Sequence, residues 1–120
     1  NGSWSSGHIF SGSAVVDLEN TSGMGLGAVV AFFTHSGVSS GGGVVQVQSI
    51  AYSTDDGFTF TKYDRNPVLE YPGHSDFRDP KVFFDEVSKR WVMAVSGGNN
   101  VLFYGSLNMK TWKYLSKFDD

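Results

Sequence analysis

Two charged residues, Arg78 and Asp79, stand directly before Pro80 in the segment HSDFRDPKVFF (74–84), just ahead of an apolar run. A guanidinium and a carboxylate at the start of a buried strand must be paired with each other, cap a turn or serve a ligand. Proline is tolerated at the first residue of a strand, so Pro80 fits a strand start. From these residues alone, a local ion pair and a ligand-binding role remain equally open.

A second polar group, FSGS (10–13), also precedes an apolar run. Ser11 and Ser13 carry hydroxyls that could bind a polar ligand, and Phe10 adds an apolar wall. Beside Gly12, the two serines also fit a simple turn, and this alternative is favoured when the segment is taken by itself.

The elements that must hold these residues are short strands. Eight apolar runs are rich in β-branched or aromatic residues, and clusters of Gly, Asn, Asp or Ser separate most of them, which is typical of strands and turns. The sequence therefore predicts an all-β fold without a long helix. The expected strands lie within residues 14–17, 26–35, 44–53, 58–63, 81–85, 90–96, 101–106 and 111–116.

The eight runs divide into two similar sets of four. The third run of each set ends in Tyr and Ser, and a polar turn then leads to Thr59-Phe60 or Thr111-Trp112. A tandem four-stranded unit of this size is typical of β-propeller blades, here at about residues 9–66 and 77–118, and an eight-stranded β-sandwich is the alternative. Propellers need about four to eight blades, so two blades must belong to a larger propeller or assemble with other copies.

The first strand of each blade in a propeller borders the central channel. FSGS opens the first unit and FRDP (77–80) opens the second, so the two segments should meet at the same mouth of that channel. Together they offer hydroxyls, an apolar wall, one cation and one carboxylate. This combination suits a sugar, whose hydroxyls bind polar groups and whose ring face packs on aromatic side chains.

Two further aspartates are interpreted as structural. In STDDGFTF (53–60), Asp55 would accept hydrogen bonds from turn amides, Gly57 would adopt a positive φ, and Phe60 would anchor the next strand in the core. Asp17 ends an apolar run and is likewise interpreted as a turn acceptor.

Composition excludes several functions. The net charge is −3 with no basic stripe, which argues against nucleic-acid binding, and no segment approaches the ~20 apolar residues of a membrane span. There is no cysteine, the three histidines lack metal-ligand spacing, and we expect neither a metal nor another cofactor. Two N-glycosylation sequons begin at Asn1 and Asn20 and weakly favour secretion.

Several ordered motifs resemble glycoside hydrolase family 32, in particular its invertase, exo-inulinase and levanase group. The resemblance covers nearly the whole chain. It is carried by FSGSAVVD (10–17), QSIAYSTDDGFTFTKYDRNPVL (48–69), FRDPKVFF (77–84) with KRWVMAVS (89–96), and LFYGSLNMKTWKYLSKF (102–118).

This resemblance implies a five-bladed β-propeller that hydrolyses terminal β-fructofuranosyl bonds with retention, in sucrose or in the fructans inulin and levan. Asp79 matches the acid that binds fructose hydroxyls and stabilises the oxocarbenium-like transition state. Arg78 would orient the acidic residues and hold substrate hydroxyls. The remaining matches in the fructose pocket are Phe10 and Ser11, with Gly12 and Ser13 shaping the same loop.

Two parts of the family's catalytic set have no counterpart in these 120 residues. The Asn-Asp-Pro-Asn motif of the nucleophile and the Glu-Cys motif of the acid/base are both absent, and Glu19, Glu70 and Glu86 stand in other contexts. We therefore expect an internal part of a longer fructosidase, with the nucleophile upstream and the acid/base downstream. The isolated chain should be inactive, because a retaining mechanism needs two carboxylates.

Three functions compete. The first is a β-fructofuranosidase that acts outside the cell or in the vacuole. The second is a non-catalytic carbohydrate-binding propeller that has lost the chemistry, and the third is a propeller scaffold for protein partners. In the isolated chain, exposed faces meant for neighbouring blades would favour self-association.

Overall fold

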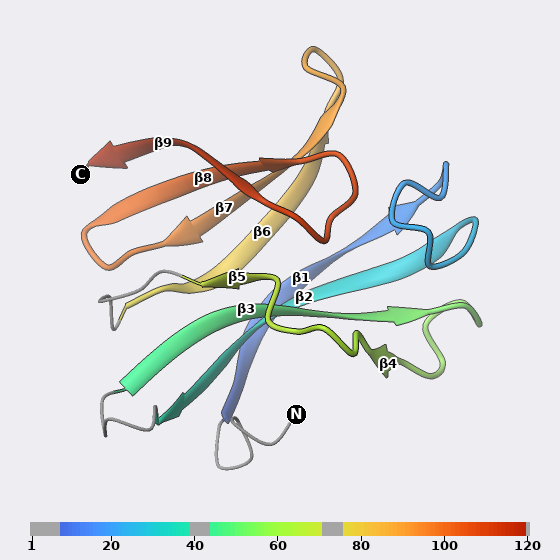
Figure 1. Cartoon of the computed structure of the whole chain (residues 1–120), viewed down its shortest axis with the longest axis horizontal. Coiled ribbons are helices and arrows are strands. Elements are labelled where there is room, and N and C mark those ends of the chain that lie inside the picture. Colours follow the sequence, from blue (N-terminus) through green and yellow to red (C-terminus); the bar gives the residue numbers. More distant parts are fainter. Residues whose placement is uncertain (1–7, 39–43, 71–75, 120) are drawn as a thin grey trace.

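The computed structural model describes residues 8–38, 44–70 and 76–119, and for residues 8–11, 38 and 44 it describes the backbone alone. The described residues form nine β-strands joined by turns, arranged in two antiparallel sheets. Figure 1 shows the two sheets one above the other, the first coloured blue to green and the second yellow to red. None of the described residues belongs to a helix that could span a membrane.

The first sheet has the strand order β1-β2-β3-β4, with β5 also paired to β3. The expected run at 58–63 forms only the two-residue strand β4, and β5 was not expected from the sequence. The strands are β1 (His8–Asp17), β2 (Ala28–Val38), β3 (Val44–Ser53), β4 (Thr61–Lys62) and β5 (Leu69–Glu70).

The second sheet follows chain order, β6-β7-β8-β9. Its strands are β6 (Arg78–Asp85), β7 (Arg90–Ser96), β8 (Asn100–Ser106) and β9 (Lys113–Asp119). A β-sandwich of the immunoglobulin type exchanges strands between its sheets through Greek-key connections, whereas each sheet here is built from one continuous stretch of chain. The prediction of an all-β chain with two propeller blades is confirmed.

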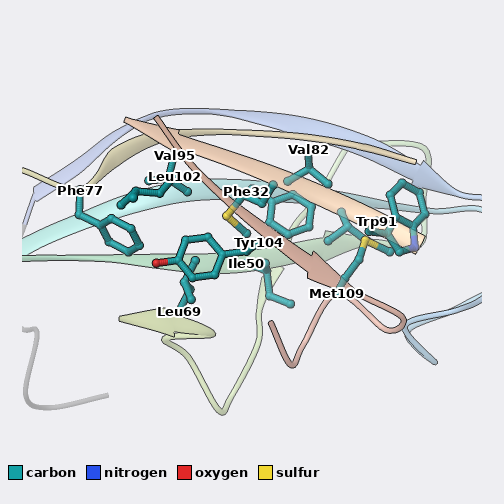
Figure 2. Close-up of a cluster of buried hydrophobic side chains, with 12 residues drawn as sticks. Phe32, Ile50, Leu69, Phe77, Val82, Trp91, Val95, Leu102, Tyr104 and Met109 are labelled. Carbon is teal, nitrogen blue, oxygen red and sulfur yellow. The ribbon is translucent and has the colours of Figure 1, made fainter. Parts of the chain in front are cut away.

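The core lies between the two sheets. Alternation along β2 turns Val30 and Phe32 toward the second sheet, where Met93 of β7 and Leu102 of β8 are almost fully buried. Figure 2 shows Phe32 and Ile50 from the first sheet among side chains of the second. Removing a buried aromatic ring of this kind typically costs about 3–5 kcal/mol, so Phe32→Ala should weaken the packing between the sheets.

The turn after β3 forms as expected in its polar part. Asp55 accepts hydrogen bonds from the amide and the hydroxyl of Thr59, and Gly57 has a φ of 91°. Hydrogen bonds from the hydroxyls of Ser53 and Thr59 lower the pKa of Asp55 to about 2. The expectation for Phe60 is wrong. Its side chain is 47% exposed, because the strand that follows is only two residues long and lies at the edge of the sheet.

The equivalent turn of the second sheet does place its aromatic residue in the core. Ser106 accepts bonds from the amides of Asn108 and Met109, as Ser53 accepts them in the first sheet. Trp112 then packs edge-on against Phe32, with ring centroids 5.9 Å apart. The two turns share one design, but only the second delivers an anchor to the core.

Asp17 is a turn acceptor, as predicted. Its fully buried carboxylate accepts four hydrogen bonds, from the amide and hydroxyl of both Thr21 and Ser22, at 2.6–2.9 Å. Burial acts to raise the pKa of Asp17, but the bonds from Ser22 and Thr21 outweigh it and hold the pKa below its ordinary value. Trp91 of β7 donates its indole N–H to Thr21, which ties this turn to the second sheet.

Candidate functional site

A shallow hollow of about 340 Å³ opens where β1 and β6 lie against each other, and we call it the Asp79 hollow. Its lining consists of Gly12, Ser13, Asp79, Pro80 and Lys81. The two segments that were expected to converge at one mouth therefore do so through Gly12, Ser13 and Asp79. Phe10 and Ser11 belong to β1, but their side chains lie outside the described ones.

Both first strands are irregular beside the hollow. The pairing of β1 with β2 shifts between Phe10 and Gly12, and the pairing of β6 with β7 shifts between Arg78 and Lys81. Bulges of this kind locally interrupt the ladder of hydrogen bonds and redirect side chains, and they are common next to active sites. The sequence places its polar residues where each strand departs from regular pairing.

Gly12 is required by a close approach of two backbones. A Cβ at this position would lie 1.7 Å from the carbonyl oxygen of Phe32 in β2, so no other residue fits without moving the backbone. The narrow glycine contact lets β1 bend at its bulge and brings Ser13 against β6.

Ser13 joins the two sheets at the floor of the hollow. Its hydroxyl donates to the carbonyl of Pro80 at 2.9 Å and accepts from the amide of Val82 at 3.2 Å. Proline has no N–H to offer, and the bulge leaves its carbonyl outside the regular ladder, so the serine satisfies backbone groups that the sheet does not.

Asp79 has a φ of 60°, in the left-handed region that few residues other than glycine adopt. Aspartate tolerates this region better than most residues. The residue is exposed at the hollow, and its backbone amide donates to the hydroxyl of Thr34 in β2 at 3.1 Å. Asp79 is therefore exposed to solvent, while its backbone amide is held by Thr34 of the first sheet.

Two glutamines of β3 hold the neighbouring peptide. Gln46 accepts from the amide of Phe77 at 2.8 Å, and Gln48 donates to the carbonyl of Phe77 at 2.6 Å. Gln48 also accepts from the hydroxyl of Thr34 at 2.8 Å. Leaving buried polar groups without partners costs stability, and this network supplies these groups with hydrogen-bond partners.

Arg78 is directed toward Asp76 and Gln46, and it is not among the residues that line the Asp79 hollow. Its guanidinium donates to Asp76 at 2.8 Å and to Gln46 at 3.2 Å. The bond to Asp76, supported by the charges of Asp76 and Asp79, raises the pKa of Arg78 above its ordinary value. Among the described residues, Arg78 forms its ion pair with Asp76 and not with Asp79, the partner considered from the sequence.

Sequence reasoning missed Thr34, Gln46 and Gln48. The signal was present, since two glutamines two residues apart in an apolar strand must share one face of the sheet. Their partner, the Phe77 peptide, lies 29 to 31 residues further along the chain, and no local pattern announces it.

A second hollow, of about 330 Å³, lies at the far ends of β1 and β6. Leu18, Phe84 and Trp91 contribute apolar surface, and Glu19 and Glu86 stand on its lining. Within the described parts of the chain, no three acidic or histidine side chains are grouped so that they could hold a metal ion. Of the two sequon asparagines, Asn20 is exposed in a turn, and Asn1 lies outside the described residues.

The sequence profile described as "Glycosyl hydrolases family 32 N-terminal domain" matches residues 2–120. The chain belongs to glycosyl hydrolases family 32. Within this family it is 52% identical over 115 residues to a levanase of Bacillus subtilis, an alignment that covers 93% of this chain and 16% of the levanase. It is 42% identical over 118 residues to the extracellular exo-inulinase of Meyerozyma guilliermondii, covering 92% of this chain and 22% of that protein.

Solved structures of family 32 enzymes share the fold. The fructofuranosidase of Schwanniomyces occidentalis, solved in complex with fructose, superposes with a TM-score of 0.83 at 41% identity. The match covers 95% of this chain and 23% of that one. The chain therefore spans 16% to 23% of the length of these family 32 relatives.

Proposed function

We propose that this chain is the part of a β-fructofuranosidase that carries the transition-state-stabilising acid, Asp79, within a larger five-bladed propeller. The nucleophile and the acid/base are supplied by other parts of the same protein. The substrates are sucrose or fructans, cleaved at a terminal fructosyl unit. Membership of family 32 supports the general activity.

One observation carries the assignment of Asp79. The residue lies at a bulge in the first strand of the second sheet, in a left-handed conformation, beside the first strand of the other sheet. An exposed carboxylate on a backbone fixed by buried hydrogen bonds is suited to contacts that must be formed before the reaction begins.

The proposed chemistry takes place in two steps. A carboxylate outside this chain attacks the anomeric carbon of fructose, the glycosidic C–O bond breaks, and a glutamic acid gives its proton to the leaving oxygen. Water then hydrolyses the fructosyl ester and returns a proton to the glutamate. Positive charge develops on the sugar ring in both steps, and the Asp79 carboxylate stabilises that charge more than it stabilises the neutral substrate.

The remaining residues would bind fructose. Arg78 would hold substrate hydroxyls, Phe10 and Ser11 would line the fructose pocket, with Phe10 as its apolar wall, and Gly12 and Ser13 would shape the same loop. The name of the extracellular exo-inulinase relative supports secretion, which would also allow glycans at Asn1 and Asn20. In the isolated chain, exposed Phe83 and Phe118 would favour self-association.

The test compares the full-length protein that carries this segment with its Asp79→Asn variant, which removes the charge and keeps the size. Fructose release is measured from sucrose, inulin and levan. We expect kcat to fall by about 100-fold or more while KM changes little, because the carboxylate acts mainly in the transition state. The isolated 120-residue chain should release no fructose from any of the three.

Two results would overturn the proposal. Asp79→Asn with an unchanged kcat would exclude Asp79 from the chemistry. A full-length protein that binds fructose but releases none from any substrate would indicate a carbohydrate-binding propeller instead.

A further inference from the structure

We propose that Thr34 and Gln48 of the first sheet are positioning residues for Asp79 of the second sheet. They act through the backbone and touch no substrate. This inference rests on the proposed role of Asp79. In this inference, the orientation of the Asp79 carboxylate depends on Gln48 and Thr34, which lie 31 and 45 residues away in sequence, on a different blade.

The two residues form a buried relay. Thr34 and Gln48 face each other across β2 and β3, and both are fully buried. The Thr34 hydroxyl donates to the Gln48 side-chain oxygen and accepts from the Asp79 amide, at 2.8 and 3.1 Å. The Gln48 side-chain nitrogen then donates to the Phe77 carbonyl. Each donor in this series of hydrogen bonds has one acceptor, so each group is oriented by the group to which it is bonded.

The relay holds the segment where the β6 ladder is interrupted. Arg78 pairs with Ser96 and Lys81 pairs with Ala94, so the peptide of Asp79 lies inside the bulge. Without a partner from the neighbouring strand, its amide would be unsatisfied, and Thr34 supplies the acceptor. The left-handed φ of Asp79 is a sparsely populated conformation that persists only where surrounding contacts impose it.

The side chain of Phe77 locks the same segment from within. It is fully buried and packs edge-on against Tyr104, with centroids 6.1 Å apart. The ring fixes the position of the segment, and the relay fixes the rotation of its peptides. A leucine in place of Gln48 would preserve much of the packing and lose only the hydrogen bonds that fix the rotation of the peptides.

The experiment uses the full-length protein with variants Gln48→Leu and Thr34→Val. Both keep roughly the shape of the side chain and remove its hydrogen bonds. Thr34→Ser keeps the hydroxyl and serves as the conservative variant. Ser49→Ala is the matched control, because Ser49 is also buried in β3 but points to the opposite face.

The first readout is steady-state kinetics with sucrose and inulin. A misplacement of about 1 Å can cost about 100-fold in rate, so we expect Gln48→Leu and Thr34→Val to lower kcat by about 10- to 100-fold with KM changed by less than about threefold. Thr34→Ser and Ser49→Ala should stay within about threefold of the parent. Equal kcat in all variants of an active protein would overturn the inference.

The second readout does not need activity. Hydrogen exchange of a peptide covering residues 76–82 includes the amide of Asp79, which is bonded to Thr34. The relay predicts faster exchange there in Thr34→Val, and parental exchange in Thr34→Ser and Ser49→Ala. If the full-length protein releases no fructose, the proposed function fails, and exchange alone decides whether the relay holds Asp79. Unchanged exchange in Thr34→Val would refute the relay in either case.

Discussion

The hydroxyl of Ser13 in β1 donates a 2.9 Å hydrogen bond to the carbonyl of Pro80 in β6, so the first strands of the two sheets are joined directly below the Asp79 hollow. The same oxygen accepts from the amide of Val82. A single small side chain therefore supports two backbone groups of the other sheet.

Ser13→Ala should lower the free energy of unfolding of the full-length protein by about 1–3 kcal/mol, because it leaves a carbonyl and an amide without partners. Urea unfolding followed by tryptophan fluorescence measures this change. Ser88→Ala, which removes a hydroxyl from an exposed turn, is the control and should change stability by much less. Equal effects of the two substitutions would show that the bridge between the sheets contributes no more than a hydrogen bond in an exposed turn.

Gly12→Ala tests the close approach of β1 to β2. The added methyl group would meet the carbonyl oxygen of Phe32, and the strands must separate to admit it. Overpacking of this kind typically costs about 1–3 kcal/mol, and more where the obstacle is backbone. We expect a lower melting temperature, and a melting curve identical to the parent's would mean that the bulge accommodates a side chain.

Asp17 should make stability depend on acid. Its folded pKa lies below the ordinary 3.8, so its stabilising effect is complete above that value and is lost as the pH falls through the lower folded pKa. Asp17→Asn should cost about 2–3 kcal/mol at pH 7, because the amide nitrogen faces donors and two acceptor positions are lost. Urea titrations should show the gap to the parent narrowing below about pH 4.

Asp56→Asn is the control for this pH experiment. It removes the same charge from an exposed turn residue whose left-handed φ suits asparagine. A gap for Asp17→Asn that stays constant from pH 7 to pH 3 would contradict the assignment of the carboxylate as the titrating group.

Trp91 and Thr21 should be energetically coupled. The indole N–H donates to the Thr21 hydroxyl at 2.9 Å, across the boundary between the sheets. Trp91→Phe and Thr21→Val, measured singly and together, should give a coupling energy of about 0.5–3 kcal/mol. Strict additivity in urea unfolding would mean that this bond does not stabilise the fold.

Much of the fold was visible in the sequence because its signals are local. Short runs rich in β-branched and aromatic residues, separated by turn residues such as Gly57, predicted the strands and the repeat, and the repeat in turn predicted that Gly12, Ser13 and Asp79 meet. The prediction that Phe60 is buried was wrong, because its burial depends on the length of the strand that follows, which no residue in the turn determines.

The candidate site was only half visible for a related reason. Asp79 stands in a recognisable motif, and its proposed role follows from the resemblance of that motif to family 32. Gln46 and Gln48 look like ordinary polar interruptions of a strand until the Phe77 peptide is placed beside them. Contacts between sheets depend on tertiary packing, which periodicity within one strand does not encode.

The relay from Gln48 through Thr34 to Asp79 also limits how such proteins can be recombined. Repeated blades look like interchangeable modules, and the sheet boundary looks like the natural crossover point for a chimera. A crossover between Glu70 and Asp76 would take Asp79 from one parent protein and Thr34 and Gln48 from another. Asp79 would then be held by a sheet with which it has not evolved. The two facing sheets should therefore be exchanged together. Chimeras that move both sheets should retain the geometry of the relay, which the exchange of a single blade loses.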